Sequence, residues 1–147
     1  MSHARSLARR YAVQAIYQWQ LNQLDDQAVD LYFVPEKDRR RIDEDYFNDL
    51  VQQVVRNTTE LDEAVAPVLD RGLAAVDPVE LAILRLGVCE FKHHIDVPYR
   101  VVINEGIELA KLFGAENSHK YINGILDKLA KSLRPIETAD KPAGKTT

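Results

Sequence analysis

Apolar residues recur every three to four positions along most of the chain, and this spacing predicts helices. The first stripe starts at Leu7 and predicts a helix that runs to about Gln23. Later stripes predict further helices over about 43–55, 61–69, 78–94, 100–113 and 118–133. The β-branched run at 101–103 is the best strand candidate, but helical spacing follows it. We therefore expect an all-α fold.

Several polar residues lie where helices should begin. Asp77 can cap the helix that starts at Pro78, and Glu80 can reach back to the cap amide. Thr59, with Asp62 three residues later, resembles another capping box. The helix after Pro78 is apolar on more than one side, so we expect it to lie at the centre of the fold.

The order of these segments predicts two small helical subdomains packed together. The first spans 1–72 and the second 73–135, and each is small enough that we expect them to share one core. Residues 25–42 show no clear period and predict a loop with a short turn. Residues 136–147 are polar and aperiodic, which predicts a disordered tail.

Composition supports a folded soluble protein and narrows its location. The 147 residues are 46% hydrophobic and 29% charged, as in ordinary globular domains. Cys89 is the sole cysteine, so no intrachain disulfide can form, which suits a reducing cytoplasm. The most apolar stretch, 79–89, is too short to span a bilayer. We expect a cytoplasmic protein that does not enter membranes.

Catalytic and metal-binding patterns are weak. Cys89 and His93 share a helix face, but Cys89 lies among apolar residues, where a cysteine usually acts as a small buried hydrophobe. One cysteine with His93, His94 and His119 does not make a convincing zinc set. We therefore expect no enzymatic activity, no cofactor and no metal.

The first helix carries a candidate RNA-binding stripe. Arg10, Gln14 and Tyr17 follow helical spacing off the core face, with Arg5 and Arg9 nearby. A guanidinium can hold phosphate, an amide can read a base edge, and a phenol ring can stack on an unpaired base. Alternatively, Tyr17 simply packs on a neighbouring helix.

A second candidate patch lies where the last helix begins. Asn117 precedes His119, Lys120 and Tyr121, so a cation again sits beside an aromatic ring at a helix N-terminus. Tyr121 is also a plausible core residue. The net charge of −4 disfavours general nucleic-acid binding, but screening lets a local basic end act alone over about 10 Å.

Two long runs resemble the NusB family of transcription antitermination factors. They are ARRYAVQAIYQWQ at 8–20 and DVPYRVVINEGIELAKLFGAENSHKYINGILD at 96–127. The likeness covers nearly the whole chain apart from the tail and part of the 25–42 loop. It implies an all-helical bacterial cytoplasmic factor with two helical subdomains and no catalytic activity.

The resemblance also implies partners and site residues. NusB proteins bind the boxA element of ribosomal RNA leader transcripts as a heterodimer with NusE, a small-subunit ribosomal protein. They act with other Nus factors on RNA polymerase. Arg5, Arg9 and Arg10 match the family's arginine-rich first helix. Tyr121 stands where the family often has Phe, and Asn117 stands where an acidic residue is also seen.

Two other functions fit parts of the pattern. The chain is alternatively a protein-only adaptor, or a relative that forms a homodimer through its RNA face. It also resembles the N-terminal domain of some ribosomal RNA cytosine methyltransferases. That enzyme would need a glycine-rich methyl-donor domain, which these 147 residues do not contain. We expect the RNA-binding adaptor.

Overall fold

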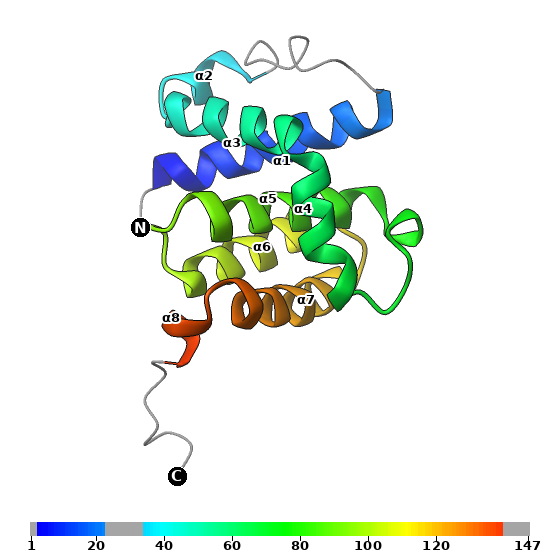
Figure 1. Ribbon diagram of the computed structural model, residues 1–147. Helices are drawn as coiled ribbons and strands as arrows, with labels where there is room; N and C mark the ends of the chain where they lie inside the picture. The colour runs from blue at the N-terminus through cyan, green and yellow to red at the C-terminus, as the bar shows by residue number, and fades with distance from the viewer. Residues whose placement is uncertain (1–2, 23–33, 140–147) are drawn as a thin grey trace.

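Helices make up all the regular structure in the part of the chain that is described, residues 3–22 and 34–139 of a computed structural model (Figure 1). The all-α prediction is confirmed there, and the run at 101–103 is helical. The first half of the predicted 25–42 loop, residues 25–33, and residues 140–147 of the predicted tail lie outside the described residues. The elements are α1 His3–Asn22, α2 Glu36–Arg39, α3 Glu44–Arg56, α4 Thr58–Val65, the 3-10 turns η2 Ala66–Val68 and η3 Leu73–Ala75, α5 Pro78–His93, α6 Tyr99–Phe113, α7 Ser118–Leu133 and α8 Pro135–Ala139.

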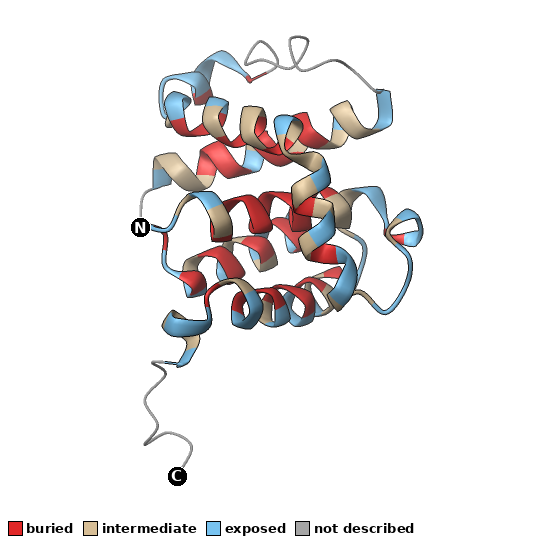
Figure 2. Cartoon of the chain, in the orientation of Figure 1, coloured by how far each residue is buried: buried red, intermediate tan, exposed pale blue. Residues whose placement is uncertain are grey.

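Helix α5 lies at the centre of the molecule, as its apolar sequence predicts. Every residue from Ala82 to Phe91 is buried. Helices α1 and α3 pack against it on one side and α6 and α7 on the other, and α4 crosses it in front (Figures 1 and 2). The buried apolar residues of both predicted subdomains form one core, as expected. The division at residue 72 itself stays a prediction.

Two of the predicted helix starts hold, with one difference. Asp43 caps α3 by accepting a hydrogen bond from the backbone N–H of Tyr46 at 3.0 Å. Asp77 caps α5 by accepting from the N–H groups of Val79 and Glu80. The predicted return contact of Glu80 is wrong, because its carboxylate instead accepts a hydrogen bond from the Ser118 hydroxyl at 2.7 Å.

Two other boundaries differ from the sequence prediction. Thr59 does not cap α4, which begins one residue earlier; the hydroxyl of Thr58 donates back to the carbonyls of Val54 and Val55. The predicted tail begins with helix rather than disorder, since α8 includes residues 136–139. Glu137 holds this helix in place by accepting a hydrogen bond from the backbone N–H of Tyr99 at 2.9 Å.

Candidate nucleic-acid interface

The outer face of α1 carries three of the predicted RNA-binding side chains. Arg10 is exposed, and Gln14 and Tyr17 are half-buried on the same face; we call these three residues the α1 strip. The Gln14 side-chain amide donates to the backbone carbonyl of Arg10 at 3.2 Å, which steadies it beside the guanidinium. The strip therefore presents a cation, an amide and an aromatic ring together.

A hollow of about 350 Å³ opens beside the strip. Tyr17 packs against the core and also lines this hollow, so it is both a packing residue and a surface residue. Aromatic and amide groups around an open hollow suit an unstacked base, which needs a ring to stack on and partners for its polar edge. Its lining comes from α1, α5 and α6: Val13, Gln14, Tyr17, Gln18, Val79 and Phe113.

A second hollow, of about 340 Å³, lies between α1 and α6 and has mixed charge. Arg10 lines it opposite the carboxylates of Glu105 and Glu108. The Ser6 hydroxyl donates to Glu105 at 2.8 Å. Because these acids repel phosphate, this hollow does not favour a nucleic-acid backbone.

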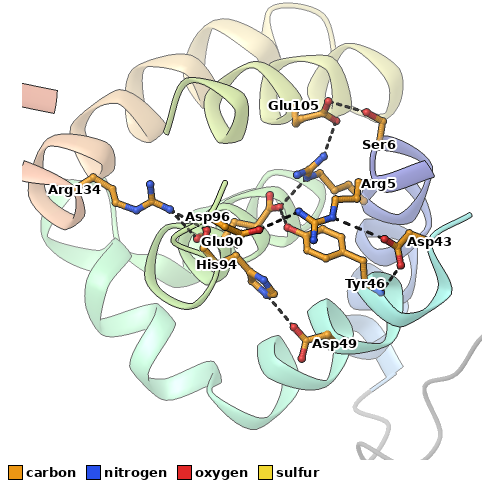
Figure 3. Close-up of polar contacts among 11 residues, drawn as sticks. Arg5, Ser6, Asp43, Tyr46, Asp49, Glu90, His94, Asp96, Glu105 and Arg134 are labelled. Carbon is orange, nitrogen blue, oxygen red and sulfur yellow. Dashed lines mark hydrogen bonds and ion pairs between the residues drawn. The ribbon is translucent and has the colours of Figure 1, made fainter. Parts of the chain in front are cut away.

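Arg9 does not lie on the surface, which corrects its expected place in the RNA patch. Its side chain is 1% exposed, its Nε lies 2.8 Å from Glu90 Oε2, and its Nη1 lies 3.7 Å from Glu105 Oε1. The Tyr46 hydroxyl donates to the same Glu90 oxygen (Figure 3). Burial alone lowers the pKa of Arg9, but the nearby charge of Glu90 raises it overall, so the guanidinium stays charged.

Arg5 lies at the edge of this buried cluster and faces away from the α1 strip. Its guanidinium lies over the Tyr46 ring, 4.2 Å from the centroid. It also forms ion pairs with Asp43 at 3.8 Å and Asp96 at 3.4 Å (Figure 3). The structure therefore separates Arg5 and Arg9 from Arg10.

The second predicted patch lies at the start of α7. Asn117 is exposed and has the left-handed backbone conformation, φ 71°, but its side chain makes no cap hydrogen bond. His119 is half-buried and Lys120 is exposed. Tyr121 packs against the core beneath Arg71, whose guanidinium lies 4.8 Å from the ring centroid. Lys120 is thus the accessible cation of this patch, and Tyr121 is mainly a packing residue.

The start of α5 connects the two patches. Val79 lines the hollow beside Tyr17, and the next residue, Glu80, binds the Ser118 hydroxyl at the start of α7. The sequence reasoning did not identify Val79, Phe113 or Gln18 as part of this surface. Gln18 had a signal, since it lies one helical turn after Gln14; Val79 and Phe113 come from other helices.

Catalytic and metal-binding features stay weak in the described ranges. Burial raises the pKa of the Cys89 thiol, which donates to Gln53 Oε1 at 3.4 Å, and this disfavours the reactive thiolate. Among the described residues, His, Cys, Asp and Glu side chains form no group of three or more that is able to hold a metal ion. None of the helices in residues 3–22 and 34–139 is long and apolar enough to cross a membrane.

Comparison with known proteins agrees with the fold and the sequence pattern. The sequence model of the NusB family matches residues 6–131. The transcription antitermination protein NusB of Alcanivorax borkumensis is 51% identical, over 94% of this chain and 92% of its own length. That of Mannheimia succiniciproducens is 53% identical, over 88% of this chain and 90% of its own. A solved structure of T. maritima NusB superposes with a TM-score of 0.75 at 28% identity, covering 89% of this chain and 93% of that one. The chain therefore belongs to the NusB family and acts in transcription antitermination.

Proposed function

We propose that the protein binds the boxA element of ribosomal RNA leader transcripts as a heterodimer with NusE, in the bacterial cytoplasm. Other Nus factors and RNA polymerase join this complex indirectly, and ribosomal RNA synthesis continues past terminators. The observation that supports an RNA surface most is the α1 strip, in which Gln14 and Tyr17 line a hollow of about 350 Å³ and the exposed Arg10 lies one helical turn before Gln14.

Each exposed group has a separate task in this proposal. The Arg10 guanidinium and the Lys120 ammonium contact phosphates, because both are exposed cations. The Gln14 amide reads a base edge, and the Tyr17 ring stacks on an unpaired base. His119 and Asn117 line the path between these contacts. Arg5 and Tyr121 have no direct RNA contact in this proposal, since Arg5 pairs with Asp43 and Asp96 and Tyr121 packs against the core.

Binding of labelled boxA RNA and of a scrambled RNA of equal length tests this proposal. Fluorescence anisotropy is measured with the protein alone and with NusE, over a salt series. We expect boxA to bind more tightly than the scrambled RNA, and NusE to widen that difference. Equal affinity for both RNAs at every salt concentration contradicts specific recognition. Size-exclusion chromatography with and without RNA then shows whether a homodimer covers the RNA face.

Replacing Tyr17 by alanine should weaken boxA binding by about 1–3 kcal/mol, because one base loses its stacking partner. The salt dependence should stay nearly unchanged, since no phosphate contact is lost. Ile136→Ala is the control, because Ile136 is an exposed apolar residue on α8, away from the α1 strip. If Tyr17→Ala instead lowers the melting temperature strongly, while the folded variant binds boxA RNA with the affinity of the wild type, Tyr17 is only a packing residue.

Replacing Asn117 by aspartate should weaken boxA binding, and the loss of affinity relative to the wild type should be larger at low salt. The new negative charge lies on an exposed residue beside Lys120 and repels the RNA backbone. Asn117 already has φ 71°, which Asp also tolerates, so the fold should not change. Unchanged affinity at low salt contradicts a phosphate path beside this residue.

A further inference from the structure

The short helix α2 carries exposed cations beside the start of α1. Lys37 on α2 and Arg40 and Arg41 directly after it are all exposed, and we call them the α2 basic cluster. Among the described residues, no hydrogen bond or ion pair involves the side chain of Lys37 or Arg40. Arg41 makes only peripheral contacts, 2.9 Å to the His3 ring and 4.0 Å to Asp38. The cluster is thus available to bind an anion.

Two acids of the same segment, Asp38 and Asp43, are engaged by other residues of the fold. Asp38 is buried on α2 and accepts a hydrogen bond from the Tyr11 hydroxyl. Asp43 caps α3 and pairs with Arg5. Glu36 on α2 is exposed, as are Glu44 and Asp45 at the start of α3, while α2 and the two residues after it expose Lys37, Arg39, Arg40 and Arg41. Although acids and bases alternate along this stretch, the fold exposes the bases and engages two acids, so the outer face of α2 is more basic than its composition indicates.

Contacts on the two flanks of α1 place the cluster relative to the α1 strip. On one flank Tyr11 reaches Asp38 of α2, and the backbone carbonyl of Ala4 accepts a hydrogen bond from the N–H of Asp43 at 3.1 Å. On the opposite flank Ser6 reaches Glu105 of α6. The strip therefore lies between a basic flank and an acidic flank. His3, which contacts Arg41, precedes Arg10 by seven residues, or about 10 Å of helix.

We propose that the α2 basic cluster binds backbone phosphates of the single-stranded RNA that the α1 strip holds, and so lengthens the RNA path toward α2. This inference rests on the proposed RNA-binding function. The contact is independent of base sequence, because exposed lysine and arginine side chains meet the phosphate backbone rather than base edges. The acids Glu105 and Glu108 repel the backbone from the other flank, which favours the same direction.

The test compares two RNAs and two charge-matched variants in the complex with NusE. One RNA is the boxA element alone, and the other carries uridine extensions at both ends. Lys37→Gln/Arg40→Gln removes two cations from α2, and Lys128→Gln/Lys131→Gln removes two exposed cations from α7 as the control. Anisotropy gives each affinity between about 50 and 200 mM salt, and circular dichroism checks that each variant is folded.

The α2 variant should bind the extended RNA several-fold more weakly at the lowest salt, and its salt slope should fall by about 1.4, as two lost phosphate contacts require. Its affinity for boxA alone should change less. An equal loss in the α7 control shows a general charge effect and overturns the proposal, as does an unchanged affinity for the extended RNA. A scrambled RNA with the same extensions has the same phosphates. It therefore tests α2 even if boxA specificity, and with it the proposed function, fails.

Discussion

Replacing Glu90 by glutamine should lower the free energy of unfolding by about 3–5 kcal/mol, as the loss of one partner of a buried ion pair usually does. The Glu90 side chain is 2% exposed and lies 2.8 Å from Arg9 Nε. Without the carboxylate, the Arg9 guanidinium keeps its charge in the core with Glu105 at 3.7 Å as its remaining acid. Urea denaturation followed by circular dichroism measures the loss.

The double variant Arg9→Met/Glu90→Gln separates the buried charge from the packing. Methionine fills much of the volume of arginine, and the glutamine oxygen still accepts the hydrogen bond of the Tyr46 hydroxyl. We expect this variant to be more stable than Glu90→Gln alone, because neither charge is left unpaired. A loss below about 1 kcal/mol in the single variant contradicts the buried pair.

The same double variant distinguishes the structural role of Arg9 from the RNA-binding role that the sequence suggested. If Arg9 only joins α1 to α5, the stable double variant should bind boxA RNA with the affinity and salt slope of the wild type. If Arg9 contacts a phosphate, the slope should fall by about 0.7 for one lost contact. The two roles therefore give different results in one titration.

Helical periodicity alone predicts that the side chain of Arg9 is buried in the core. Arg5 and Arg9 are four residues apart, and Ala12 and Ile16 continue the same face into the core. Arg10 lies about 100° further round the helix and reaches the surface. The sequence interpretation grouped Arg5, Arg9 and Arg10 by charge, because a buried arginine is rare and its partner, Glu90, lies 81 residues away.

The helices were predictable because their apolar spacing is regular, and the caps at Asp43 and Asp77 mark their starts. The hollow beside Tyr17 was not predictable, since Val79 and Phe113 reach it from other helices. Tertiary packing also determines the partner of Glu80, whose carboxylate accepts a hydrogen bond from Ser118 on α7 rather than from the start of its own helix. The local sequence thus determines where the helices begin and end, and contacts between distant residues determine which side chains line the surface hollows.

Replacing Leu126 by alanine should destabilise the protein by about 2–5 kcal/mol, the usual range for a fully buried leucine. Leu126 lies on α7 and is 0% exposed. Its methyl groups enter the space left by two glycines: a Cβ on Gly87 would lie 2.7 Å from Leu126 Cδ2, and one on Gly106 would lie closer still to Cδ1. Because neither glycine has a side chain to move into the hole, the cavity should persist, and the loss should lie in the upper part of this range.

Two variants give the controls in thermal and urea denaturation. Leu112→Ala removes an exposed leucine, 53% accessible, and should change stability by less than about 0.5 kcal/mol. Leu126→Met keeps most of the volume and should cost less than about 1.5 kcal/mol. A loss in Leu126→Ala no larger than in Leu112→Ala contradicts a tight seam between α5, α6 and α7.

A second substitution at Gly106 tests the geometry of this seam. In the Leu126→Ala background the added methyl group of Gly106→Ala occupies part of the cavity, and alanine also favours helix over glycine by about 1 kcal/mol. In the wild type the same methyl group meets Leu126 Cδ1, and the clash offsets that gain. The double-mutant cycle should therefore give a favourable coupling between the two substitutions. Additive effects show that α6 and α7 are further apart than the contact at Gly106 requires.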